Sequence, residues 1–368
     1  MVKASELADR MQHGTFRFPS NSCGIRLNPH ELLAVTNNKI DFARLAELAD
    51  TSIVSAAALD RETVVELCRF AALLELTEIE AYRPLHGKIA ITAFFEASTR
   101  TRLSFESAVM RLDGKVLSVP DGKVTGVAKG ESLADIGEMF NTYGDVVIMR
   151  HPESDSIREI RKNLTMPLVN AGNGIDEHPT QALLDWYALL KWRPGLADRD
   201  CPRGRRIHLG VIGTPSSMRA VRSFLRVAAL FADAIERVTV VSSDPAPFGA
   251  ELLASLPRDA LRIEVTTAFD EVLPELDVIY MNSIALIDGT YHELGRQFAI
   301  TEHSRLRPDA VVMHPLARRQ ELSPHLDDTR HNLYFAQAAG AVYLRQALLI
   351  CVLGRLASLP TSVLYLAS

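Results

Sequence analysis

Residues 89–105 read IAITAFFEASTRTRLSF, an apolar run that passes into a helical pattern within a few residues. The run Ile89–Phe95 is continuously apolar, as strands are when both faces of a parallel sheet are covered. A helical pattern begins at about Arg100. A strand followed directly by a helix is the repeating unit of α/β folds. This segment therefore predicts an α/β protein.

The same alternation continues along the chain. Further predicted strands are the short apolar runs Val116–Val119, Val146–Met149, Ile207–Ile212, Val238–Val241, Val278–Met281 and Val311–Met313. Predicted helices are Arg61–Leu76, Arg100–Leu112, Ser132–Thr142, Pro179–Leu190, Ser217–Phe231 and Gln337–Ala357. We therefore predict two doubly wound parallel-sheet domains, with the C-terminal helix returning to the first domain.

A domain boundary is predicted at Trp192–Arg206, where proline, glycine and charged residues replace the periodic apolar pattern. The first domain is then 49–192, completed by the C-terminal helix 337–357, and the second is 205–336. Residues 1–48 form an N-terminal extension to which the sequence assigns no function. A length of 368 residues suits this division, since domains average about 100–200 residues.

Composition excludes several classes of protein. The net charge of −5 offers no general basic field for nucleic acid. The cysteines are far apart and form no CxxC pair, which argues against a disulfide framework and a zinc ribbon and favours a reducing cytoplasm. The N-terminus lacks the apolar core of a secretory signal, and the apolar stretch Ala347–Leu353 is too short to span a bilayer. We expect a cytoplasmic protein with no metal, cofactor, nucleic-acid or membrane partner.

The start of the helix after Phe95 suits an anion. Ser98 and Thr99 are good N-caps, and the free N–H groups of the first turn point beyond the strand end. Together with the Arg100 guanidinium, these groups would hold a phosphate. A lone Ser-Thr pair before a helix is usually only a cap. A more specific pattern for an anion site is the run Ser-Thr-Arg-Thr-Arg directly after a buried strand.

Two further strand ends carry polar residues. Val146–Met149 delivers Arg150, and a run beginning at Pro167 leads to His178 and Gln181 at a helix start. Ligands of open parallel sheets bind outside the carboxyl ends of the strands. We therefore expect Ser98, Thr99, Arg100, Thr101, Arg150, His178 and Gln181 to face one crevice. His178 taken alone is more often a helix cap than a catalyst.

These motifs resemble those of the aspartate/ornithine carbamoyltransferase family, over about residues 53–353. The matching carbamoyl-phosphate motifs are STRTR at 98–102, RHP at 150–152 and HPTQALLD at 178–185. The aspartate branch is the more similar, through MHPL at 313–316, YFAQAAG at 334–340 and RQALL at 345–349. Ornithine enzymes carry His-Cys-Leu-Pro at the first of these places, and no cysteine lies near His314 here.

The resemblance implies a role for each matched residue. Ser98, Thr99 and Arg100 would bind the phosphate of carbamoyl phosphate. Thr101, Arg150 and His178 would donate toward its carbonyl oxygen, while Gln181 and the carbonyls near Leu316 would orient its amide. The resemblance also implies a homotrimer with shared sites, in which Thr125 and Lys129 reach a neighbouring subunit, and a place in pyrimidine biosynthesis. The chemistry needs no metal or cofactor.

The acceptor side departs from the family pattern. Arg219 matches the arginine that binds the α-carboxylate of aspartate, but Ser283 and Ala285 replace the arginine and glutamine expected after Met281. Ala317 also replaces a usual proline. Either Arg296, Arg318 or Arg319 supplies the missing charge, or the chain carbamoylates a different amine. A non-catalytic homologue that retains the fold is a further alternative.

Overall fold

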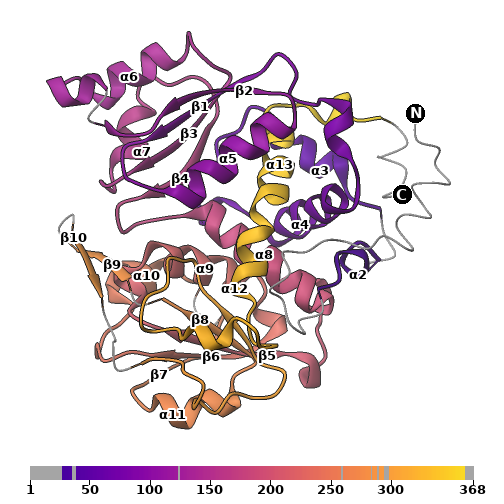
Figure 1. Cartoon of the computed structure of the whole chain (residues 1–368), viewed down its shortest axis with the longest axis vertical. Coiled ribbons are helices and arrows are strands. Elements are labelled where there is room, and N and C mark those ends of the chain that lie inside the picture. Colours follow the sequence, from indigo (N-terminus) through magenta and orange to yellow (C-terminus); the bar gives the residue numbers. More distant parts are fainter. Residues whose placement is uncertain are drawn as a thin grey trace. The chain divides into compact units, whose positions relative to one another are not determined.

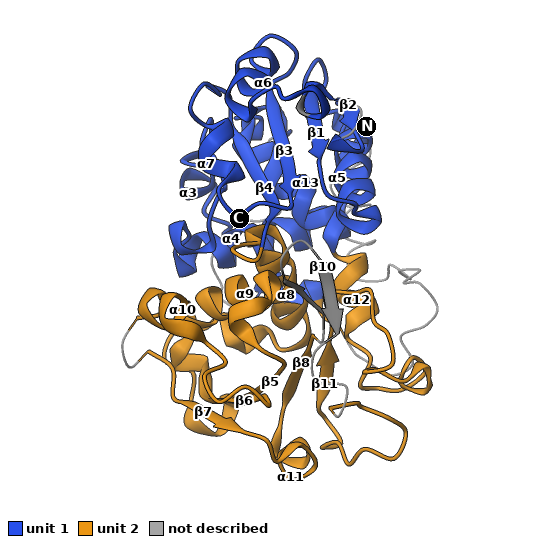
Figure 2. Ribbon diagram, turned by 90° about the vertical axis from the view of Figure 1, so that its left-hand side faces the viewer, with its two compact units in different colours: residues 1–17, 29–174, 341–368 blue, residues 18–28, 175–340 orange. Residues whose placement is uncertain are grey.

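The computed structural model describes residues 27–34, 39–122, 125–257, 260–282, 284–287, 290–293 and 298–360. Figure 2 shows two compact units, which divide the chain after Gly174 and again after Gly340. The first unit combines the described residues of 29–174 with those that follow Gly340. The second comprises the described residues of 175–340 together with Leu27 and Asn28. Each unit contains one parallel sheet, which confirms the predicted α/β fold class.

The sheet of the first unit has the strand order β2-β1-β3-β4 (Figure 1). All its strand pairs are parallel. The strands are β1 (Ile89–Phe94), β2 (Lys115–Val119), β3 (Val146–His151) and β4 (Leu168–Asn173). The α-helices are α2 (Pro29–Ala34), α3 (Phe42–Ala46), α4 (Arg61–Leu76), α5 (Thr99–Arg111), α6 (Leu133–Phe140), α7 (Ser156–Ile160) and α13 (Ala341–Val352).

The C-terminal helix returns to the first unit as predicted: α13 packs against α4 and α5 (Figure 1). The structure corrects its extent. The predicted helix 337–357 is two helices, α12 (Tyr334–Ala339) and α13, which are separated at Gly340, where the chain passes from one unit to the other.

The length argument against a membrane span needs correction as well. Tyr334–Val352 comprises 19 residues with a mean hydropathy of 1.4, which by length and composition is enough to cross a bilayer. However, 67% of the apolar window in this stretch is buried inside the protein. That burial is typical of a core helix, so the stretch needs no lipid to cover it.

Part of the N-terminal extension belongs to the first unit. Helices α2 and α3 both pack on α4, with Leu32 and Leu45 fully buried. The ring of Phe42 meets that of Phe70 edge-on, at 5.4 Å between centroids. The described part of the extension therefore contributes to the core, while its predicted loop-like centre at 19–24 lies outside the described residues.

The sheet of the second unit has the order β11-β8-β5-β6-β7, and all its pairs are parallel. The strands are β5 (Ile207–Ile212), β6 (Ile235–Val241), β7 (Ile263–Thr266), β8 (Val278–Met281) and β11 (Val311–Met313). An antiparallel hairpin, β9 (Ile284–Ile287) with β10 (Thr290–Glu293), follows β8. The α-helices are α8 (Pro179–Trp192), α9 (Arg219–Leu230), α10 (Gly249–Ser255), α11 (Phe269–Val272) and α12.

The unit boundary at residue 174 differs from the predicted domain boundary after 192, because α8 groups with the second unit. The reason is that an aromatic side chain of α8 packs against one ring on α9 and another ring just after that helix. Trp186 of α8 stacks on Phe231 with ring centroids 4.1 Å apart, and Phe224 of α9 lies 6.1 Å from the same indole. Such large apolar rings contribute strongly to core energetics.

Candidate functional site

The N-terminus of α5 keeps its polar groups available. Ser98 occupies the N-cap position, but its hydroxyl makes no capping hydrogen bond, which corrects the prediction that it caps the helix. Thr99 and Arg100 are exposed. The N–H groups of the first turn therefore lack a side-chain cap from Ser98 and can bind an anion.

The two arginines of this motif have different surroundings. Arg102 lies 3.5 Å from the Glu106 carboxylate and donates to the Ser118 hydroxyl at 3.2 Å. Arg100 makes no ion pair with any residue that the structure describes. Between them, Thr101 is buried, and its carbonyl accepts a hydrogen bond from Arg345 at 3.4 Å. Arg100 is therefore the guanidinium that is left for a ligand.

Arg150 is held by Glu96. Its Nε and Nη2 both donate to one Glu96 oxygen, at 3.1 and 2.5 Å. The two side chains are only 12% and 8% exposed, so the ion pair is largely withdrawn from water. Sequence reasoning missed Glu96, although it is the acidic residue between β1 and α5. A ligand that binds Arg150 has to compete with this carboxylate.

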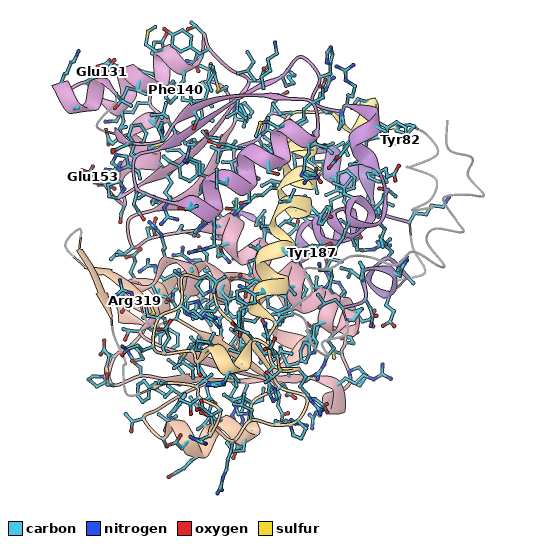
Figure 3. All side chains as sticks on the ribbon, viewed as in Figure 1. Tyr82, Glu131, Phe140, Glu153, Tyr187 and Arg319 are labelled. Atoms are coloured by element: carbon cyan, nitrogen blue, oxygen red, sulfur yellow. The ribbon has the colours of Figure 1, made fainter. Side chains whose placement is uncertain are left out.

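His151, the neighbour of Arg150, has a structural role. Its Nδ1 accepts the backbone N–H of Glu153 at 3.1 Å, which requires that Nδ1 carry no proton. Burial lowers the pKa of His151, which favours that neutral form. Figure 3 shows Glu153 in the segment after β3. The imidazole therefore shapes the turn that follows Arg150.

Residues 125–129 form the short helix η4 (Gly126–Lys129) and the residue before it. The Thr125 hydroxyl donates to the Gly122 carbonyl at 2.6 Å, and Lys129 is exposed. An exposed lysine at the end of a turn is compatible with reaching another molecule, and its role stays a prediction.

In the second unit, His178 and Gln181 lie at the start of α8. His178 occupies the N-cap position of α8, but its side chain makes no capping hydrogen bond. Its backbone N–H donates to the Ser223 hydroxyl at 2.9 Å. Ser223 in turn donates to Glu177 at 2.7 Å, which ties the start of α8 to α9. Gln181 donates from Nε2 to the Asp185 carboxylate at 2.7 Å.

The loop after β5 approaches the end of β8 closely. Gly213 has a φ of +133°, and a Cβ there would lie 2.3 Å from the Asn282 carbonyl oxygen. This glycine lets the segment leading to Arg219 lie beside the carboxyl end of β8. Arg219 is the first residue of α9 and is half-buried. Ser283 lies outside the described residues, and Ala285 pairs with His292 in the hairpin.

The structure answers part of the question about the missing charge. Arg318 donates to the Asp327 carboxylate at 2.6 Å and lies over the Tyr334 ring, 5.4 Å from its centroid. Its guanidinium therefore has an internal partner. Arg319, labelled in Figure 3, is exposed, and its backbone N–H donates to both Glu321 oxygens at 3.0 Å. Arg296 lies outside the described residues.

The segment after β11 has an unusual backbone. Leu316 has a φ of 56°, and its peptide bond to Ala317 is cis, although no proline follows. The Leu316 N–H donates to Nδ1 of His314 at 2.8 Å.

The predicted residues lie in two groups. In the first unit, residues 98–101 follow β1, and Arg150 lies within the last two residues of the neighbouring strand β3. In the second, Arg219 and Leu316 follow β5 and β11, which flank β8 on either side. These residues lie at or beyond the carboxyl ends of strands, where open parallel sheets bind ligands. His178 and Gln181, predicted to share one crevice with residues 98–101 and Arg150, lie at the start of α8 in the second unit, so the shared crevice stays a prediction. Among the described residues, no cluster of His, Cys, Asp and Glu is arranged to hold a metal ion.

Comparisons with known proteins agree with the motifs. Residues 51–191 match the family model "Aspartate/ornithine carbamoyltransferase, carbamoyl-P binding domain", and 205–352 match "Aspartate/ornithine carbamoyltransferase, Asp/Orn binding domain". The aspartate carbamoyltransferase catalytic subunit of Picrophilus torridus is 34% identical over 74% of this chain and 87% of its own. That of Methanopyrus kandleri is 32% identical over 84% of this chain and 99% of its own.

Solved structures show the same relationship. Trypanosoma cruzi aspartate transcarbamoylase in complex with carbamoyl aspartate and phosphate is 32% identical and has a TM-score of 0.72. The alignment covers 84% of this chain and 97% of that one. The same enzyme in complex with carbamoyl phosphate and aspartate has a TM-score of 0.72 at 30% identity and covers 84% and 98% of the two chains. The resemblance predicted from the motifs is confirmed: the chain belongs to the aspartate/ornithine carbamoyltransferase family.

Proposed function

We propose that this protein transfers the carbamoyl group of carbamoyl phosphate to the amino group of an amino acid. The observation that carries the proposal is the start of α5, where Ser98, Thr99 and Arg100 stand at an uncapped helix N-terminus. The family supports it, since the solved relative binds carbamoyl phosphate and aspartate.

The start of α5 would hold the phosphate through N–H groups, hydroxyls and the Arg100 guanidinium, and would stabilise the negative charge as phosphate leaves. Thr101, Arg150 and His178 would donate to the carbonyl oxygen as the tetrahedral intermediate forms. For this, Arg150 exchanges its Glu96 partner for substrate. Each such donor is typically worth about 3 to 4 kcal/mol of transition-state stabilisation.

The reaction needs no covalent enzyme intermediate. The neutral amine nitrogen attacks the carbonyl carbon, the bond from that carbon to the phosphate oxygen breaks, and the amine gives up a proton. The departing phosphate is the proposed acceptor of this proton, so no carboxylate pair is required. Gln181 and the Leu316 carbonyl would orient the carbamoyl NH₂ group.

Arg219 is the proposed contact for the acceptor's α-carboxylate. Aspartate is the leading acceptor because the relatives described above are aspartate enzymes, and its use would place the protein in pyrimidine biosynthesis. A different amine is the second candidate. The observation in its favour is the internal pairing of Arg318 with Asp327, together with the serine at 283 and the alanine at 285.

We also propose a homotrimer, in which Thr125 and Lys129 complete a neighbouring subunit's site. Support comes from apolar side chains exposed on α5 and the edge strand β2. Leu103, Met110 and Leu117 are 49%, 59% and 46% exposed. A surface of this kind is typical of a protein interface. A cytoplasmic location is proposed because Cys201 and Cys351 are free, buried thiols.

The test is phosphate release from carbamoyl phosphate, above its spontaneous decay, with aspartate, ornithine, other amino acids and diamines. Saturable turnover with aspartate supports the leading acceptor. If only an amine other than aspartate is carbamoylated, the residues at 283 and 285 are the ones that determine acceptor specificity. If no amine is carbamoylated, the proposed function is wrong and the non-catalytic alternative stands.

Arg100→Ala should reduce turnover at least about a hundredfold, since it removes a charged group from the leaving phosphate. The matched control is Arg111→Ala at the other end of the same helix, where the arginine pairs with Glu80 at 2.8 Å on the surface. That variant should keep its activity. Near-normal turnover in Arg100→Ala contradicts the phosphate assignment.

A further inference from the structure

Asp185 is a buried carboxylate to which the proposed mechanism gives no role. It lies on α8 one helical turn after Gln181, with none of its surface exposed. Its Oδ1 accepts the side-chain amides of Gln181 and Gln337, at 2.7 and 2.5 Å. Its Oδ2 accepts the Tyr280 hydroxyl at 2.7 Å. Both oxygens therefore receive hydrogen bonds, and the donors come from three elements of one unit: α8, α12 and β8.

The hydrogen bonds continue from Gln337 to the segment after β11. The Gln337 Oε1 accepts the backbone N–H of His314 at 3.0 Å. His314 Nδ1 accepts the Leu316 N–H at 2.8 Å, so its proton is on Nε2, which lies 2.8 Å from Glu321 Oε1. An unbroken series of bonds thus links Gln181 to Leu316 through Asp185, Gln337 and His314.

This series determines the direction of each group. Because Gln181 donates to Asp185 through Nε2, its carbonyl oxygen is the amide atom left to accept from a ligand. Because the Leu316 N–H is bound to His314, the peptide plane between Pro315 and Leu316 is held in place, next to the Cα that carries the Leu316 carbonyl. The Gln181 side chain and the backbone that leads into the Leu316 carbonyl are therefore both connected to the same buried carboxylate.

We propose that Asp185 is a positioning residue that aligns the Gln181 and Leu316 carbonyl oxygens as a pair of acceptors for one NH₂ group. The inference rests on the proposed function, because carbamoyl phosphate supplies that group. Acceptors held in place before the substrate arrives lower the cost of orienting the carbamoyl group for attack.

Alternative amino acids at 185 distinguish positioning from charge. Asp185→Leu has a similar size but accepts no hydrogen bond, so both amides lose their partner. Asp185→Asn keeps one oxygen for the two amides, and its NH₂ can donate to the Tyr280 hydroxyl, which can also accept. An asparagine therefore preserves the geometry without the charge, provided that the Tyr280 hydroxyl is present.

The experiment measures kcat for carbamoyl transfer, the affinity for inorganic phosphate, and the melting temperature. We expect Asp185→Leu to lower kcat at least about tenfold, while phosphate affinity stays within about twofold because α5 is untouched. Asp185→Asn should restore most of kcat, and combining it with Tyr280→Phe should remove this rescue. A loss in Asp185→Asn as large as in Asp185→Leu overturns positioning in favour of charge.

A control separates positioning from folding. Like Asp185, Asp277 is a buried aspartate, and it accepts the His208 N–H at 2.8 Å. It directly precedes β8, however, and so lies at the amino end of that strand. Asp277→Asn should lower the melting temperature and leave kcat unchanged. If it lowers kcat as much as Asp185→Leu does, the role of Asp185 is merely structural.

A double-variant cycle tests the route through Gln181. If Asp185 acts through this residue, Gln181→Ala combined with Asp185→Leu should lose less activity than the product of the two single losses. Fully multiplicative losses overturn the inference. A wild-type chain that carbamoylates no amine rejects the proposed function and this inference with it, whereas an active wild type beside a fully active Asp185→Leu rejects the inference alone.

Discussion

At the scale of single residues, the buried ion pair of Glu96 with Arg150 should contribute more to stability than an exposed ion pair. We expect Glu96→Gln to lower the free energy of unfolding by about 1 to 3 kcal/mol, because Arg150 keeps its charge and loses its charged partner. The control is Asp155→Asn. Its partner Arg158 lies 3.0 Å away, and both side chains are 69% exposed, so the loss should be below about 1 kcal/mol. Chemical denaturation measures both, and equal losses contradict the prediction.

The buried Asp185 should make stability depend on pH. Burial raises its pKa from 3.8 to about 7, against three hydrogen bonds that favour the ionised form. Between these values the folded chain binds the proton and the unfolded chain does not, so this group's contribution to stability falls as pH rises from about 4 to 7. The fall amounts to about 4 kcal/mol at most.

Asp185→Asn removes that dependence. Relative to wild type, the variant should therefore be more stable at pH 8 than at pH 5, as measured by urea denaturation at the two values. Carboxyls whose pKa is lowered, such as Glu321 and Asp327, change stability with pH in the opposite direction. Their contribution is the same in the variant and in wild type, so it cancels in the comparison. A difference that does not change with pH contradicts the assignment of the raised pKa to Asp185.

At the scale of elements, Gly213 is the point where the segment after β5 meets the end of β8. Gly213→Ala should destabilise the protein, because φ is +133° and the new Cβ would lie 2.3 Å from a carbonyl oxygen. The displaced segment carries Arg219, so KM for the acceptor should rise more than KM for carbamoyl phosphate. Gly204→Ala, with nothing within 4 Å, is the control and should behave as wild type. Equal changes in both KM values contradict the role assigned to this turn.

The elements show what a sequence pattern can and cannot predict. Helix α4 and strands β5, β8 and β11 have the predicted bounds, because their apolar runs are continuous or strongly periodic. Strand β7 was not predicted, since it is an edge strand with half-exposed residues and no continuous apolar run. The start of α5 was predictable because a helix N-terminus leaves its signature within a few residues. Glu96 with Arg150, 54 positions apart, and Asp185 with Gln337, 152 apart, are paired only by the fold.

At the scale of the whole molecule, removal of α13 should abolish phosphate binding. A chain that ends at Gly340 lacks the helix that covers α4 and α5, including Arg345, which donates to the Thr101 carbonyl. Fully buried side chains such as Leu349 and Ile350 are lost with it, and each is typically worth about 2 to 5 kcal/mol. Binding of inorganic phosphate, followed by calorimetry, checks this. Unchanged affinity in the shortened chain contradicts it.

The path of the chain between the units has a consequence for how the protein is made. The second unit consists almost entirely of the continuous stretch 175–340, whereas the first is built from segments on both sides of it. On the ribosome, the second unit can assemble as soon as its own residues emerge. Helix α5 is synthesised before the second unit but gains its α13 neighbour only after that unit has been made. The start of α5, where phosphate is proposed to bind, therefore matures only after the intervening second unit has been translated, so a nascent chain cannot complete this part of the proposed site while that unit is being made.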